Sequence, residues 1–249
     1  MSRLIFASNP TGRGLLRFLS EREFRCLLSK LETLELERGQ VLQEPGRSLN
    51  HLYFPTSAVI SMQCIMENGA TAEMGLVGHD GVAGIALLLG EAASPCYSFV
   101  QFAGTAMRLS RADAQKEFSR GGELQFLLLR YTQALINQLA QTAVCSRLHS
   151  VRERLCRCLL LRHDLIRSDE LMMTQEGLAN VLGERRESVT VAAGHLQNSG
   201  LIHYSRGHIQ ILDRRGLEAS SCECYRVVKS ASSCLFAPLL SISDSHRPA

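Results

Sequence analysis

The stretch TQEGLANVLGERRESVTVAAGHLQNSGLI, residues 174–202, decides the fold. Thr174 is a typical helix N-cap, and apolar residues then recur at helical spacing until Gly183, where a left-handed turn costs little. Beyond the glycine, the apolar residues of a second helix stand at i, i+3, i+4 and i+7: Val189, Ala192, Ala193 and Leu196. Small Ala179 permits a close crossing of the two helices. The pattern predicts a helix-turn-helix with Thr174, Ala179, Gly183 and Val189 as structural residues.

Burial of that stripe leaves charged and polar residues on the opposite face, at the start of the second helix. Arginine can donate two hydrogen bonds to guanine and glutamate can accept one from cytosine, so Arg186 beside Glu187 suits a helix that reads base edges. The competing interpretation is a solvated helix start, but two arginines there would oppose the helix dipole. We expect DNA contacts from Arg185, Arg186, Glu187, Ser188, Thr190 and Val191.

The segment NSGLIHYSRGHIQIL, residues 198–212, predicts two strands around a Ser-Arg-Gly turn, which is a β-hairpin wing. Ser205, Arg206 and His208 are expected to contact phosphates there, which positions the protein without reading sequence. Residues 174–212 contain as many glutamates as arginines, so affinity is expected to need further basic residues, helix N-termini and dimerisation. The further basic residues are Arg147, Arg152, Arg154 and Arg157.

Short strand-like runs fill the chain from about Leu34 to Leu109, and turn signals such as Pro45-Gly46 and Asn68-Gly69 separate them. Many short strands in so few residues indicate a jelly-roll or barrel-like β domain. Amphipathic helical segments at 15–31 and 111–118 flank it. The predicted fold class is therefore α+β.

A long helix begins near Glu123, and no proline or glycine interrupts the pattern until past Leu160. Its leucines recur every three to four residues, which is typical of a seam that pairs with a second copy of the chain. The alternative is a helix packed on its own β domain. The residues expected at the dimer interface are Leu124, Leu128, Tyr131, Leu135 and Leu139.

These patterns divide the chain into four parts: a β-roll domain with flanking short helices at 1–120, a dimerisation helix at 121–149, a winged helix-turn-helix at 150–217 and a C-terminal tail at 218–249. The last twenty or so residues, which are rich in serine, are expected to be poorly ordered.

Composition narrows the class of protein. With 249 residues, 45% of them hydrophobic, the chain can bury a sizeable core. No segment approaches the roughly 18 uninterrupted apolar residues of a membrane span, and Asn9, Pro10 and nearby arginines preclude a signal-peptide core. We expect a cytoplasmic protein without membrane contact.

Nine cysteines, an odd number, are scattered along the chain, which favours reduced thiols. Two pairs are close, Cys156 with Cys158 and Cys222 with Cys224. One residue between cysteines is tighter than the two to four usual in zinc sites, so no metal site is expected. The role of the two pairs stays open.

The predicted order of elements resembles that of the Crp/Fnr family of bacterial transcription regulators: a β domain with glycines in its turns, then a long helix, then a winged helix-turn-helix. The specific part is residues 174–202, which match the family's DNA-binding signature at the threonine, the turn glycine, the Arg-Glu pair and the final Gly-Leu-Ile. GQVLQEPG (39–46), HLYFPTSAVIS (51–61) and GHDGVAGI (78–85) look like the sensor domains of one branch of the family.

The resemblance implies a homodimeric transcription regulator, not an enzyme, that binds palindromic promoter sites in double-stranded DNA and works with RNA polymerase. It implies base reading by Arg186 and Glu187. The best-known members carry a second base-reading arginine five places after the first, where this chain has Val191. The preferred DNA sequence is therefore expected to differ.

The sensor half departs from the cyclic-nucleotide-binding members, which use a Gly-Glu pair for the ribose and a following arginine for the phosphate. The aligned segments here read DGVAG (80–84) and ASPCY (93–97), and after Gly90-Glu91 no arginine follows until Arg108. The iron–sulfur members need an N-terminal cysteine cluster, and only Cys26 lies there. We expect neither cyclic nucleotide nor another cofactor, and the effector is unidentified.

Two other classes of function compete with a DNA-binding regulator. A metal-dependent jelly-roll enzyme needs clustered histidines, and the β segment offers only His51 and His79, which are far apart in sequence. A small-ligand-gated signalling module without direct promoter binding stays the alternative. A gel shift on random DNA separates it from the regulator.

Overall fold

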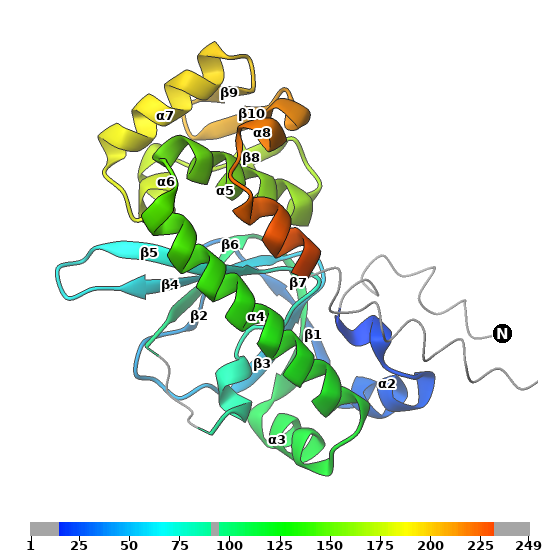
Figure 1. The fold of residues 1–249 in the computed structure, drawn as a ribbon. Coiled ribbons are helices and arrows are strands. Elements are labelled where there is room, and N and C mark those ends of the chain that lie inside the picture. The colour runs from blue at the N-terminus through cyan, green and yellow to red at the C-terminus, as the bar shows by residue number, and fades with distance from the viewer. Residues whose placement is uncertain (1–14, 91–94, 232–249) are drawn as a thin grey trace, which may run out of the picture. The chain divides into compact units, whose positions relative to one another are not determined.

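The computed structural model describes residues 15–90 and 95–231 (Figure 1). They form two compact units. The first comprises the described residues up to Met62, Leu76–Asn137 and 230–231, and the second comprises Gln63–Gly75 and Gln138–Lys229. No helix among the described residues is long and apolar enough to cross a membrane.

The first unit is the β domain with its flanking helices. Short helices η2 (Leu15–Phe18) and α2 (Glu21–Leu28) precede it, and α3 (Arg111–Arg120) and α4 (Glu123–Leu148) follow. The strands of the β domain are β1 (Glu32–Leu36), β2 (Val41–Gln43), β3 (His51–Pro55), β4 (Val59–Ile65), β5 (Thr71–Val77), β6 (Tyr97–Phe102) and β7 (Gly104–Ser110). Residues 63–75, which include the adjoining ends of β4 and β5, and the part of α4 from Gln138 onward belong to the second unit. The short helix η3 (Ile85–Leu88) lies between β5 and β6.

Two sheets enclose the core of this domain. One has the order β1-β7-β3 and the other β2-β6-β4-β5, and the registered pairs of strands, such as β3 with β7, are antiparallel. Small and branched apolar side chains from both sheets form the core: Leu36, Ala58, Ile60, Val77, Ala83, Val100 and Ala106. The predicted jelly-roll-like β domain is thus confirmed.

Helix α4 turns its leucine stripe inward. Leu124, Leu128, Tyr131 and Leu135 are buried within the single chain, and Leu139 is half-buried. A Cβ on Gly81 would stand only 2.7 Å from the Tyr131 hydroxyl, so the glycine lets α4 lie against the β domain. The prediction that this stripe faces a second copy is therefore wrong, and the alternative, a helix packed on its own domain, is correct. The exposed apolar residues on the first-unit part of α4 are Phe126, Leu129 and Ile136.

The second unit contains the helix-turn-helix. Besides Gln63–Gly75 and the end of α4, it contains α5 (Val151–Ile166), β8 (Glu170–Met172), α6 (Gln175–Leu182), α7 (Arg186–Asn198), β9 (Ile202–Ser205), β10 (His208–Ile211) and α8 (Arg214–Ser220) (Figure 1). The three strands pair in the order β8-β10-β9, and β10 is antiparallel to both neighbours. Strand β8, which the sequence patterns did not predict, gains its structure from pairing with β10.

Helical structure continues beyond residue 217, the predicted end of the winged helix-turn-helix domain. Helix α8 runs past residue 217 to Ser220, and a further helix covers 224–231. The Tyr225 hydroxyl donates to Asp164 on α5 at 2.8 Å, and Arg214 also binds Asp164, at 2.6 Å. These contacts hold the segment against α5. Residues 232–249, to which the expectation of disorder mainly applied, lie outside the described residues.

Candidate nucleic-acid interface

The helix-turn-helix owes its geometry to two local signals. The Thr174 hydroxyl oxygen accepts a hydrogen bond from the Gly177 amide at 3.0 Å, which caps α6 at its N-terminus. Gly183 has φ +63° and ψ +38°, the left-handed conformation, and its amide donates to the Ala179 carbonyl. The Glu184 amide donates to the same carbonyl at 3.0 Å. The turn predicted from Gly183 therefore ends α6 and lets α7 begin within three residues.

Helix α7 is divided into a buried and an exposed face. Its buried side chains are the four of the predicted stripe: Val189, Ala192, Ala193 and Leu196. On the opposite face Arg185, Arg186, Glu187 and Thr190 are exposed, Ser188 is half-buried, and Val191 is 60% exposed. Five of the six residues that the sequence assigned to DNA are therefore open to solvent, and they lie in the first two turns of one helix.

The charged groups at the start of α7 are available to a ligand. Within the part of the chain that the structure describes, Arg185, Arg186 and Glu187 take part in no ion pair, whereas Glu184 is paired with Arg154. Arg185 is the N-cap and its side chain makes no capping bond. The Thr190 hydroxyl donates to the Arg186 carbonyl at 2.9 Å, which leaves its methyl group exposed. Such a surface can present guanidinium donors, a carboxylate acceptor and two apolar groups to base edges.

The wing is a tight hairpin. Arg206 and Gly207 have φ values of +47° and +85°, so both central residues of the turn between β9 and β10 are left-handed, as in type I′ hairpin turns. The Met173 amide donates to the Gly207 carbonyl at 2.8 Å, and the Tyr204 amide donates to the Gln197 side chain at 2.7 Å. These bonds join the wing to the residue before Thr174 and to α7.

Ser205, Arg206 and His208 are all exposed on this hairpin, as expected for side chains that contact phosphates.

Two of the four arginines expected to assist DNA binding are used inside the protein. Arg154 is buried, binds Glu184 at 2.6 Å and donates to the Leu182 carbonyl. Arg157 is half-buried and donates to Thr142 at 2.9 Å. They are therefore not free for phosphates, and the expectation is wrong for both; Arg147 and Arg152 are exposed. Sequence reasoning missed the role of Arg154, for which the only signal is its position on the inward side of α5.

The start of α5 carries a capping box. The Ser150 hydroxyl oxygen accepts from the Glu153 amide, and the Glu153 carboxylate accepts from the Ser150 amide at 2.9 Å and from its hydroxyl at 2.6 Å. Hydrogen bonds from Ser150 lower the pKa of Glu153. The charged carboxylate thus stabilises the helix that supports α6 and α7.

In the first unit, the arginine that follows the Gly90-Glu91 pair is already paired. Arg108 donates to both carboxylate oxygens of Glu32, at 2.8 and 3.0 Å, and these bonds raise the pKa of Arg108. Glu91 lies outside the described residues. The Arg108 guanidinium is therefore bound to a carboxylate on β1.

The chain is similar to known proteins, both in its helix-turn-helix and over most of its length. Residues 153–220 match the Crp-like helix-turn-helix domain. The global nitrogen regulator of Synechococcus elongatus is 25% identical over 194 residues, and the match covers 74% of this chain and 86% of that protein. A Crp/Fnr-family regulator structure from Eubacterium rectale has a TM-score of 0.65 at 18% identity and covers 83% of this chain and 96% of the other. One from Thermus thermophilus has a TM-score of 0.64 at 21% identity, covering 76% and 98%.

The resemblance to Crp/Fnr regulators that the sequence indicated is confirmed. The chain carries a Crp-like helix-turn-helix domain, and its fold is that of the Crp/Fnr structures.

Proposed function

We propose that this chain, with its Crp-like helix-turn-helix on a Crp/Fnr fold, is a sequence-specific DNA-binding transcription regulator that acts as a homodimer. The observation that carries the proposal is the outward face of α7, where Arg186 and Glu187 are exposed and, among the described residues, not paired with each other or with a neighbour. A base-reading helix keeps them free for the major groove.

The dimer is proposed to form through the outer face of α4. Phe126 and Leu129 are each 47% exposed and Ile136 is 53% exposed, although all three are large and apolar. With Gln133 they are spaced by three, four and three residues, which is the a/d spacing of a coiled coil. Two copies paired along this face would cover these side chains. The seam is therefore rotated from the one expected from the leucines by about 150°, a little under half a helical turn.

A two-fold dimer presents two recognition helices to one face of the duplex. The preferred sites are therefore expected to be imperfect palindromes with half-sites about one helical turn apart. RNA polymerase is a further expected partner, because a regulator bound at a promoter acts through the polymerase. This role requires the compartment that contains the chromosome, which in bacteria is the cytoplasm.

The effector of the sensor domain is proposed to be something other than a cyclic nucleotide. Arg108 is held by Glu32, and a cyclic phosphate would have to replace that carboxylate to gain a cation.

Selection of binding sites from a random DNA library tests the base-reading face. Arg186→Ala should weaken binding to the preferred site by about 1 to 3 kcal/mol and relax the choice at one base position. Val191→Arg should create a guanine preference at the base step that Val191 faces, because valine donates no hydrogen bond.

Arg206→Ala on the wing is the matched control. Because this substitution removes a phosphate-binding cation, it should weaken binding to all sequences alike and lower the salt slope by about one unit. Recovery of the wild-type motif at full stringency by Arg186→Ala would show that α7 does not read bases, and the absence of any selected motif would remove sequence-specific DNA binding altogether.

A further inference from the structure

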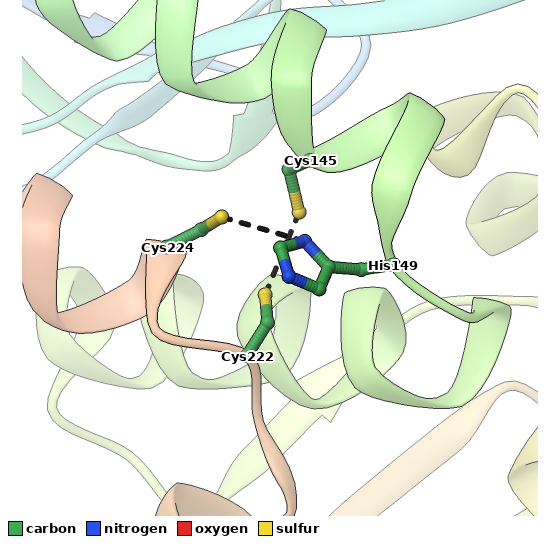
Figure 2. A group of neighbouring side chains, drawn as sticks. All are labelled: Cys145, His149, Cys222 and Cys224. Atoms are coloured by element: carbon green, nitrogen blue, oxygen red, sulfur yellow. Dashed lines mark hydrogen bonds between the residues drawn. The ribbon is translucent and has the colours of Figure 1, made fainter.

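Four side chains that can bind a metal meet in the second unit. The ligand atoms of Cys145, His149, Cys222 and Cys224 all lie within 4.8 Å of one another, and they point toward a common centre (Figure 2). The three cysteines are buried and the His149 side chain is 14% exposed. The cluster is therefore shielded from solvent and offers three sulfur ligands and one nitrogen ligand.

The chain brings them together from two places far apart in sequence. Cys145 lies in the last turn of α4 and His149 follows four residues later, where its amide still donates to the Cys145 carbonyl at 3.2 Å. Residues i and i+4 share one helix face, so both side chains point the same way. Cys222 lies between α8 and the helix at 224–231, Cys224 is the first residue of that helix, and Ser221 before them is extended. The chain then turns into the helix, so both thiols reach the same centre although only Glu223 separates them.

The distances suit a single tetrahedral ion. Zinc binds thiolate sulfur at about 2.3 Å and imidazole nitrogen at about 2.0 Å, which puts the ligand atoms of a tetrahedral site roughly 3.5 to 3.8 Å apart. The Sγ atoms of Cys145 and Cys222 are 3.5 Å apart, and Cys224 Sγ lies 3.5 Å from His149 Nδ1. A cluster with two metal ions would need its outermost ligands farther apart than the 4.8 Å found here.

Groups around the four side chains are arranged as they are around metal ligands. His149 turns Nδ1 to the cysteines and Nε2 to the Glu223 carboxylate at 3.2 Å. A histidine that binds a metal through one nitrogen commonly donates its other N–H to a carboxylate. The Gln141 amide nitrogen donates to Cys224 Sγ at 2.9 Å, as outer groups often do to a sulfur that binds a metal. Arg157 is close enough to act electrostatically on Cys145 and can balance the negative charge of a three-thiolate site.

We propose that Cys145, His149, Cys222 and Cys224 bind one Zn²⁺ ion through three thiolates and the Nδ1 atom of the imidazole. Three thiols give up their protons to solvent as the ion binds. With four protein ligands the site is closed, which is typical of structural zinc rather than catalytic zinc. The ion joins the end of α4 to the segment beyond α8, and both flank α5 in the second unit. This explains why the C-terminal segment carries a Cys-X-Cys pair.

A disulfide is the rival chemistry for these residues. It would have to bring the Cys145 and Cys222 sulfurs from 3.5 Å to about 2.05 Å. It would also leave Cys224, His149 and the hydrogen bonds of Gln141 and Glu223 without a role. A core of packed thiols that holds no metal is the other rival, because cysteine is often buried.

The test is elemental analysis of the full-length chain, purified without a histidine tag or chelator. We expect about one zinc per chain. Cys222→Ser and His149→Ala should each lose most of it, whereas Cys26→Ser, at an exposed cysteine outside the cluster, should keep it. Replacement of zinc by cobalt should give the absorption bands of tetrahedral Co²⁺ with thiolate ligands in the wild type and in Cys26→Ser only.

Measurements on the wild-type chain test the zinc site even if a variant fails to fold. Removal of the metal by a chelator should lower the thermal midpoint, and zinc, but not magnesium, should restore it. The proposal is overturned by a folded wild-type chain with only trace zinc, by stoichiometric iron in place of zinc, by a Cys145–Cys222 disulfide in peptide mapping, or by full zinc retention in both cluster variants.

Discussion

Arg154→Met separates a structural arginine from a phosphate-binding one. Methionine keeps most of the buried stem but removes the donors to the Leu182 carbonyl and to Glu184. The Leu182 carbonyl belongs to the last turn of α6, and a buried acceptor left without a partner costs about 1 to 3 kcal/mol. Glu184 is 29% exposed and can be hydrated instead, so loss of the ion pair adds at most about 1 kcal/mol. The expected loss of stability is about 2 to 3 kcal/mol.

For a chain of this size each kcal/mol lowers the thermal midpoint by about 2 to 4 °C, so the variant should unfold about 4 to 12 °C below the wild type in calorimetry. Arg152→Met, two residues away and exposed, is the control. It should change stability by less than about 0.5 kcal/mol but lower the salt slope of DNA binding by about one unit. An unchanged midpoint for Arg154→Met, together with a reduced salt slope, would refute the structural assignment and restore Arg154 as a phosphate contact.

Two further predictions concern the dimer and the response to pH. Ile136→Glu should convert the dimer to a monomer in light scattering, since it places a charge in the proposed seam, whereas Leu128→Ala should lower stability by about 2 to 5 kcal/mol and leave the dimer intact; the reverse pattern would return the seam to the leucine stripe. Because Ser150 lowers the folded-state pKa of Glu153 below its ordinary 4.5, the stability that Glu153 contributes is present above that value and lost as the pH falls through the folded-state pKa. Urea unfolding of wild type and Glu153→Gln should therefore converge in stability from about pH 6 to about pH 3, and a constant difference would contradict the assignment.

The helix-turn-helix and its wing could be predicted because their signals are local. A left-handed residue at Gly183, an N-cap at Thr174 and the spacing from Val189 to Leu196 each act within one or two helical turns. Once the stripe is buried, helix geometry alone turns Arg186 and Glu187 outward. The candidate DNA-binding face was therefore visible before any tertiary contact was known.

Helix α4 shows a feature that local sequence signals could not predict, namely which of its faces is buried. It is apolar on more than one side, and the sequence could not say which side lies inside. Contacts with the β domain decide this: Gly81, fifty residues before Tyr131, has no Cβ and so lets the Tyr131 ring approach. Strand β8 likewise depends on β10, its distant partner.

The cysteine cluster depends most on tertiary structure. Judged by their spacing alone, Cys222 and Cys224 are too close together for a usual zinc site, so no metal site was expected. Cys145 and His149 stand at helical spacing, but nothing in the sequence places them beside residues 77 positions away. Helical periodicity and turn conformation depend on neighbouring residues, so the sequence alone determines them. Contacts between distant segments decide which helix faces are buried, which arginine is buried and which thiols converge. Only the folded chain brings those side chains within bonding distance.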